Sequence, residues 1–134
     1  MCAAGPHTML MLDMEKMDGW KLASLLDDNI PVLIYNGDKD YICNWVGGLA
    51  WTDALEWTGQ AGYQRAQVST WRTASGRPGG QTKSFGSLTF LRVFDAGHMV
   101  PMNQPESAAS MLFEFIESGG LAAEFDEVND EEFS

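Results

Sequence analysis

At 134 residues the chain has the length of one ordinary domain, and 45% hydrophobic residues, with five Trp, seven Phe and three Tyr, predict a packed core. Eight Lys and Arg against 19 Asp and Glu give a net charge of −11, which disfavours nucleic acid or an anionic membrane as a partner because both attract basic surfaces. There is no apolar run of about 18 residues and no signal-peptide pattern in the first residues, so we expect neither a membrane span nor a secretion signal in this chain.

The composition divides the chain into three parts. Residues 1–17 are rich in Met and carry no clear pattern, residues 18–118 hold the apolar periodicities, and residues 119–134 are acidic and lack Lys and Arg. We expect the third part to be a solvated, disordered tail. Two cysteines, Cys2 and Cys43, are too few for a disulfide framework or a zinc site.

In chain order, the first clear element is a helix over residues 18–28, where five apolar residues from Trp20 to Leu26 share one face. Pro31 ends it and leads into a strand, Val32–Tyr35, whose unbroken apolar run is typical of a central parallel strand. Residues 43–57 are expected to form a broken helix, because each glycine of Gly47-Gly48 weakens a helix by about 1 kcal/mol.

The second half of the chain repeats the strand signal. After a loop at 60–64, residues 67–73 and 81–85 are typical of a hairpin whose turn, at 74–80, is rich in Gly and Pro. A second strongly apolar strand is expected over residues 88–94, and a helix from Pro105 to a stop at Gly119. This order predicts an α/β fold with two parallel core strands, flanking helices, and one β-hairpin lying outside the parallel sheet.

Polar residues follow both apolar strands at the point where each strand ends. Gly37-Asp38-Lys39-Asp40 comes after the first, and Asp95-Ala96-Gly97-His98 comes after the second. Because the carboxyl ends of neighbouring parallel strands meet at one edge of a sheet, we expect an acid and His98 to lie close together there. A lone histidine near apolar residues is more often structural, yet serine hydrolases of the α/β type place nucleophile, acid and base in this chain order.

Three segments resemble the C-terminal part of the serine carboxypeptidases of the carboxypeptidase Y and cathepsin A type: residues 34–45, 50–53 and 91–105. The motifs agree in order and spacing over about residues 18–117. The resemblance implies the C-terminal portion of an α/β-hydrolase fold, incomplete on its own, with peptides as substrates. It also implies a place in the lysosome, the vacuole or the secretory pathway.

The resemblance further implies roles for individual residues. Asp40 matches the acid of the catalytic triad and His98 its base, while Asp38 would support the turn. Cys43 matches a free thiol that lines the substrate pocket, and Met99 matches a residue bordering the leaving amino acid. No cofactor and no metal are expected.

The nucleophile that such an enzyme needs is not found in this sequence. No serine stands in a Gly-x-Ser-x-Gly turn or a close variant of it. We therefore expect the chain to be inactive alone and to require a complementary N-terminal chain or self-association, because two parallel strands leave an unpaired edge and uncovered apolar helix faces. Two alternatives stay open, an inactive assembly or binding module and a segment of a related acyltransferase.

Overall fold

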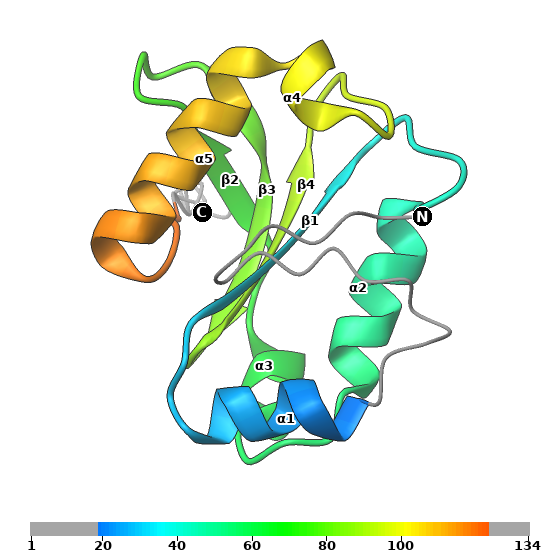
Figure 1. Ribbon diagram of the computed structural model, residues 1–134, viewed down its shortest axis with the longest axis vertical. Helices are drawn as coiled ribbons and strands as arrows, with labels where there is room; N and C mark the ends of the chain where they lie inside the picture. Colours follow the sequence, from blue (N-terminus) through cyan, green and yellow to red (C-terminus); the bar gives the residue numbers. More distant parts are fainter. Residues whose placement is uncertain (1–18, 124–134) are drawn as a thin grey trace, which may run out of the picture.

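The computed structural model of the chain describes residues 19–123 (Figure 1). The unpatterned N-terminal part, residues 1–17, and the acidic stretch from residue 124 onward lie outside the described residues. Within the described part, no helix is long and apolar enough to cross a membrane.

A four-stranded mixed sheet forms the centre of the molecule. Its strands are β1 (Val32–Gly37), β2 (Ser69–Arg72), β3 (Pro78–Phe85) and β4 (Leu88–Val93), in the order β1-β4-β3-β2. β1 and β4 are parallel neighbours whose register runs from Val32 opposite Leu88 to Gly37 opposite Val93. The expected pairing of the two apolar strands is therefore confirmed.

The expectation that the hairpin lies outside the parallel sheet is wrong. β3 pairs antiparallel with β4, from Gly80 opposite Val93 to Phe85 opposite Leu88, and β2 extends the sheet beyond β3. The cause is a tight turn between β3 and β4, where Gly86 has a φ of +55°, a conformation that glycine adopts without steric cost. This short Gly-Ser connection places β3 beside β4, so the hairpin continues the sheet.

Five helices surround the sheet in the described part of the chain: α1 (Gly19–Asp27), α2 (Trp45–Ala54), α3 (Gln60–Arg65), α4 (Val100–Asn103) and α5 (Pro105–Ser118). α1 and α5 lie where the sequence predicts helices. α3 occupies a stretch expected to be a loop, and α4 was not expected. Gly119, with a φ of +72°, ends α5 as predicted.

The helix α2 is continuous through Gly47-Gly48, so the expected break is wrong. Its first turn is capped by Asn44, whose Oδ1 accepts a hydrogen bond of 2.7 Å from the Gly47 amide. The absence of a side chain at Gly48 has a packing reason, because a Cβ there would lie 2.3 Å from Asn36 Oδ1 on β1. The glycine thus allows α2 to approach the sheet closely.

Both faces of the sheet are covered, α4 and α5 lying on one side and α2 on the other (Figure 1). Alternate residues of β1 point to opposite faces: Leu33 and Tyr35 join the cluster under α5, whereas Val32 and Ile34 join the cluster under α1, α2 and α3. This two-sided burial is the physical reason for the unbroken apolar run in β1.

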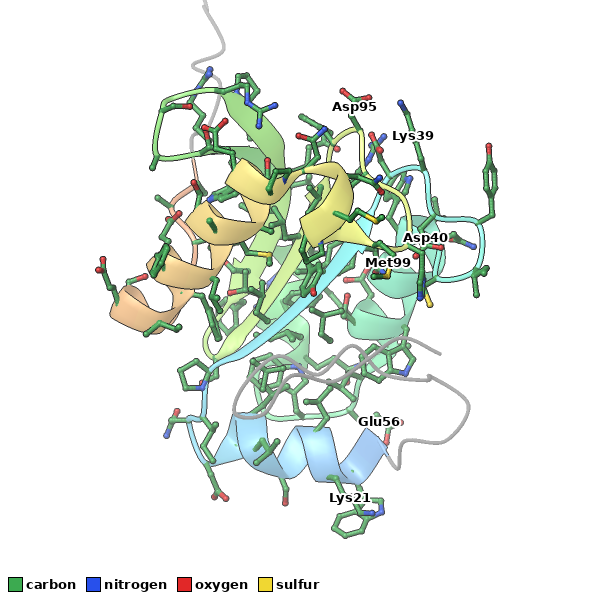
Figure 2. The ribbon with its side chains drawn as sticks, turned by 45° about the horizontal axis from the view of Figure 1, so that its top comes forward. Lys21, Lys39, Asp40, Glu56, Asp95 and Met99 are labelled. Carbon is green, nitrogen blue, oxygen red and sulfur yellow. The ribbon has the colours of Figure 1, made fainter. Side chains whose placement is uncertain are left out.

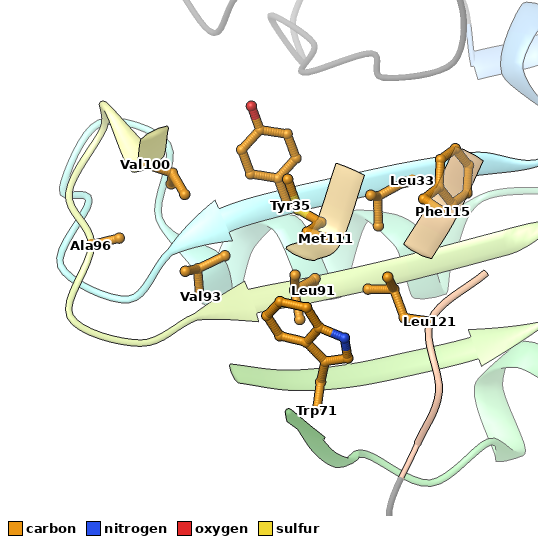
Figure 3. Close-up of a cluster of buried hydrophobic side chains, with 10 residues drawn as sticks. All are labelled: Leu33, Tyr35, Trp71, Leu91, Val93, Ala96, Val100, Met111, Phe115 and Leu121. Atoms are coloured by element: carbon orange, nitrogen blue, oxygen red, sulfur yellow. The ribbon is translucent and has the colours of Figure 1, made fainter. Parts of the chain in front are cut away.

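The cluster under α5 contains ten buried residues (Figure 3). Trp71 of β2 is fully buried in it, and its Nε1 donates a hydrogen bond of 2.9 Å to Glu114 Oε2 on α5. Leu121 also packs there with 8% of its surface exposed, although it belongs to the stretch assigned to the acidic tail. Residues immediately after α5 are therefore part of the packed domain.

Candidate active site

Two loops leave the same edge of the sheet, one after β1 and one after β4. Backbone hydrogen bonds join them, because the Asp38 amide donates to the Val93 carbonyl and the Lys39 amide to the Ala96 carbonyl, each at 2.9 Å. The loops approach each other closely at Gly37, where a Cβ would lie 2.2 Å from the Ala96 carbonyl oxygen. The parallel pairing of β1 and β4 thus places an acid-bearing loop against a histidine-bearing loop.

His98 and Asp40 meet across these loops. His98 Nδ1 lies 3.1 Å from Asp40 Oδ2, with the carboxylate side chain 2% exposed and the imidazole 33% exposed. Figure 2 shows Asp40 and Met99, the residue after His98, close together at this edge of the molecule. A buried carboxylate behind a partly exposed imidazole fixes the ring orientation and its tautomer, which is what a general base requires.

Asp40 is held in its charged form by the loop that follows it. Its Oδ1 accepts hydrogen bonds from the Ile42 amide at 2.9 Å and the Cys43 amide at 3.0 Å. Burial alone raises the pKa of Asp40, but hydrogen bonds from Cys43, His98 and Ile42 outweigh it and bring the pKa below its ordinary value. The carboxylate is therefore charged at neutral pH, so the proton between the two groups belongs on His98 Nδ1.

A family model of serine carboxypeptidases matches residues 8–118 of the chain. The chain belongs to the serine carboxypeptidase family. The resemblance drawn from the motifs after β1 and β4 is thereby confirmed.

Three carboxypeptidases illustrate the similarity. The chain is 52% identical over 102 residues to a vacuolar serine-type carboxypeptidase of Saccharomyces cerevisiae, covering 75% of this chain and 20% of the relative. It is 48% identical over 95 residues to carboxypeptidase Y of Komagataella phaffii, covering 71% and 18%. The structure of a prohormone-processing carboxypeptidase from S. cerevisiae matches with a TM-score of 0.63 and 31% identity, over 74% of this chain and 22% of that one.

The chain covers only part of the length of these relatives. It spans about a fifth of the length of each of the three carboxypeptidases. The mixed sheet with helices on both faces, together with the structural match, agrees with the α/β-hydrolase fold that the sequence predicted.

Cys43 differs from the free thiol that the serine carboxypeptidase resemblance implied. It is disulfide-bonded in this structure, so no thiol is available and that part of the expectation is wrong. The chain's only other cysteine, Cys2, lies outside the described residues. Cys43 is partly buried against the cluster under α5, and its place in a substrate pocket stays a prediction.

Two further residues of the predicted site flank the pair in the sequence: Met99 follows His98, and Asp38 stands two residues before Asp40. Met99 is 58% exposed, which leaves its side chain accessible to a ligand, and its contact with the leaving amino acid stays a prediction. Asp38 faces β4, where its Oδ2 lies 3.9 Å from Arg92 Nη2. Its side chain is thereby directed at the sheet, and Asp40 is the acid that meets His98.

Asp40, Cys43 and His98 offer three atoms within 4.8 Å of one another, a spacing that would suit a metal ion. The chemistry of these donors argues against one. A disulfide sulfur is not the thiolate that binds metals, and His98 Nδ1 is directed at the carboxylate. We therefore keep the expectation that the pair works without a metal.

Sequence reasoning missed two polar residues of the strands that carry the two loops. Asn36, 7% exposed, donates from Nδ2 to the Cys43 carbonyl at 3.0 Å. Arg92 stacks its guanidinium 4.0 Å from the centre of the Trp45 ring and donates to Gln81 Oε1 at 3.1 Å. A polar residue inside an otherwise apolar strand, as at both positions, is the signal that would have found them.

Asp40→Asn is expected to weaken the dependence of the free energy of unfolding on pH in the acid range. Because the folded-state pKa of Asp40 is lowered, its charge stabilises the fold fully above the unfolded-state value of about 4, and this contribution is lost as the pH falls through the lower folded-state pKa. Asparagine cannot carry that charge. Urea unfolding in steps from pH 7 to pH 2 should show the largest difference between the variants at neutral pH and convergence in acid; parallel curves would contradict the assignment.

Proposed function

We propose that the chain is the segment of a serine-type carboxypeptidase that supplies the acid and the base of a Ser-Asp-His triad. The observation that carries this proposal is the His98 Nδ1 to Asp40 Oδ2 distance of 3.1 Å at the carboxyl ends of two parallel strands, in a chain of the serine carboxypeptidase family. The substrate is a peptide, from which the enzyme removes C-terminal residues.

In this proposal each residue has a distinct task. With Nδ1–H donating to Asp40, the lone pair of the imidazole lies on Nε2, the atom that takes the proton of a serine as it attacks the substrate carbonyl. Asp40 stabilises the imidazolium that forms. His98 then protonates the leaving amino acid; in the second half of the reaction it takes a proton from water, which attacks the acyl-enzyme, and returns that proton to the departing serine oxygen.

The serine belongs to a segment outside this sequence, so the proposal includes a complementary chain. Among the described strands, β1 pairs on one side only, although all six of its residues are buried. Large apolar side chains are exposed nearby in the active-site loop, Tyr41 at 95% and Ile42 at 78%. Covering these surfaces would remove apolar area from water, which supports assembly with a nucleophile-bearing segment.

The relatives also support a location. One of them is a vacuolar enzyme by name, and we propose that this protein likewise works in the vacuole, the lysosome or the secretory pathway.

Recombination tests the proposed function. The chain and a separately produced serine-bearing segment of a carboxypeptidase Y relative would be refolded together and assayed on a benzyloxycarbonyl-blocked dipeptide. We expect release of the free C-terminal amino acid only from the mixture, and no labelling of this chain alone by a fluorophosphonate serine probe. Fluorophosphonate labelling of this chain by itself would contradict the missing nucleophile. Transfer of the acyl group to an added alcohol in preference to water would favour the acyltransferase alternative.

A further inference from the structure

The loop that holds Asp40 is itself held by a side chain from the strand before it. Asp40 Oδ1 depends on two amides, those of Ile42 and Cys43, and the second belongs to the residue whose carbonyl accepts the Asn36 Nδ2 hydrogen bond of 3.0 Å. A continuous path of hydrogen bonds therefore runs from Asn36 through Cys43 and Asp40 to His98.

Asn36 is well placed to act as a fixed anchor. It lies in β1 opposite Arg92 of β4 and is 7% exposed. The carbonyl of Cys43 can only accept, so the amide group must present Nδ2 to it and Oδ1 to the other side. Oδ1 is buried there against Gly48, with no hydrogen-bond partner among the described residues.

The buried, unpaired Oδ1 is the unusual part of this arrangement. Leaving a buried carbonyl-type acceptor without a partner costs free energy that a leucine of similar size would not incur. A residue chosen for packing alone would therefore not be asparagine. The feature that asparagine adds at this position is the Nδ2–H donor toward the Cys43 carbonyl.

We propose that Asn36 is a positioning residue for the triad acid, holding the 40–43 loop so that its amides keep Asp40 oriented toward His98. The inference rests on the proposed function of the His98–Asp40 pair. Asn36 acts through the loop and touches neither substrate nor the reacting atoms.

Hydrogen exchange in the 134-residue chain, assembled with the serine-bearing segment, tests this role, in reducing buffer so that a disulfide at Cys43 does not hold the loop in place of the amide. In Asn36→Leu we expect the Ile42 and Cys43 amides to exchange at least about tenfold faster than in the wild type, because their carboxylate acceptor is no longer fixed. The hydrogen-bonded Nδ1–H proton signal of His98 should broaden or disappear in the same variant. The Phe115 amide in α5 reports whether the fold as a whole is retained.

Two further variants make the outcome decisive. Asn36→Asp keeps the size of the side chain but presents an oxygen to the Cys43 carbonyl, so it should accelerate exchange as Asn36→Leu does, even if the leucine variant fails to fold. Thr82→Val is the matched control, because it removes another buried side-chain hydrogen bond, the 3.0 Å bond from Thr82 Oγ1 to the Phe90 carbonyl, far from the loop in sequence. It should change exchange at Ile42 and Cys43 less than twofold.

The failures of the two proposals are distinguishable. A wild-type chain without the His98 Nδ1–H signal would contradict the His98–Asp40 pair itself. A wild-type signal that persists unchanged in both Asn36 variants, with unchanged exchange at Ile42 and Cys43, would overturn only the role of Asn36. Exchange of these amides at the rate of an unstructured peptide in the wild type would overturn it as well.

Discussion

Replacing His98 with Ala in the assembled enzyme is expected to lower kcat/KM for a blocked dipeptide by about four orders of magnitude or more, almost entirely through kcat. The reason is geometric. The imidazole is 33% exposed and lies 3.1 Å from Asp40, so in the proposed triad it is the group that would remove the proton of the attacking serine. Steady-state kinetics of the complex between this chain and its serine-bearing segment would measure the loss.

The matched control is the chain's other histidine. His7→Ala changes the same residue type outside the described residues and should leave kcat/KM within about twofold. Thermal unfolding of both variants separates lost chemistry from lost folding. Retention of more than a tenth of the wild-type activity by His98→Ala would remove His98 from the triad.

A double variant, His98→Ala with Asp40→Asn, tests whether the two residues act as one catalytic unit. Residues that act as one catalytic unit are strongly non-additive, so adding Asp40→Asn to His98→Ala should cost less than about tenfold more. In the proposed triad Asp40 would act on the substrate only through the imidazole, and with the imidazole gone the carboxylate would have nothing to orient. Fully additive losses would indicate that Asp40 has a separate task.

Gly37→Ala is expected to destabilise the fold by about 3 kcal/mol. An added Cβ would lie 2.2 Å from the Ala96 carbonyl oxygen and 2.4 Å from the Gly97 carbonyl oxygen, both backbone atoms that cannot rotate away. The two functional loops would have to separate. We therefore expect activity to fall together with the free energy of unfolding, measured by urea denaturation.

Gly120→Ala provides the comparison for this variant. A Cβ at Gly120 meets nothing within 4 Å, so the substitution should change stability by less than about 1 kcal/mol. If Gly37→Ala behaved like Gly120→Ala, the two loops would not approach as closely as the structure has them, and the contact between Asp40 and His98 would need another explanation.

The sequence was a reliable guide where a local pattern has one physical meaning. The apolar run of β1 is buried on both faces, as an unbroken apolar strand predicts, and the helix starting at Pro105 ends at Gly119. Local patterns failed where tertiary packing compensates for a low helix propensity. Gly47-Gly48 predicts a break, yet α2 continues through it because the missing side chain lets the helix approach Asn36.

Local patterns in the sequence predict that two strands each deliver a polar residue to one edge of an α/β sheet, and they identify the family. Strand propensity, the turn at Gly37 and the motif around His98 are all local in the chain, so they can be recognised without coordinates. The pairing of the hairpin with β4, and the hydrogen bond from Asn36 to the Cys43 carbonyl in the loop after Asp40, are visible only in the folded chain. Strand order and side-chain hydrogen bonds depend on which distant segments come together, and neither composition nor periodicity contains that information.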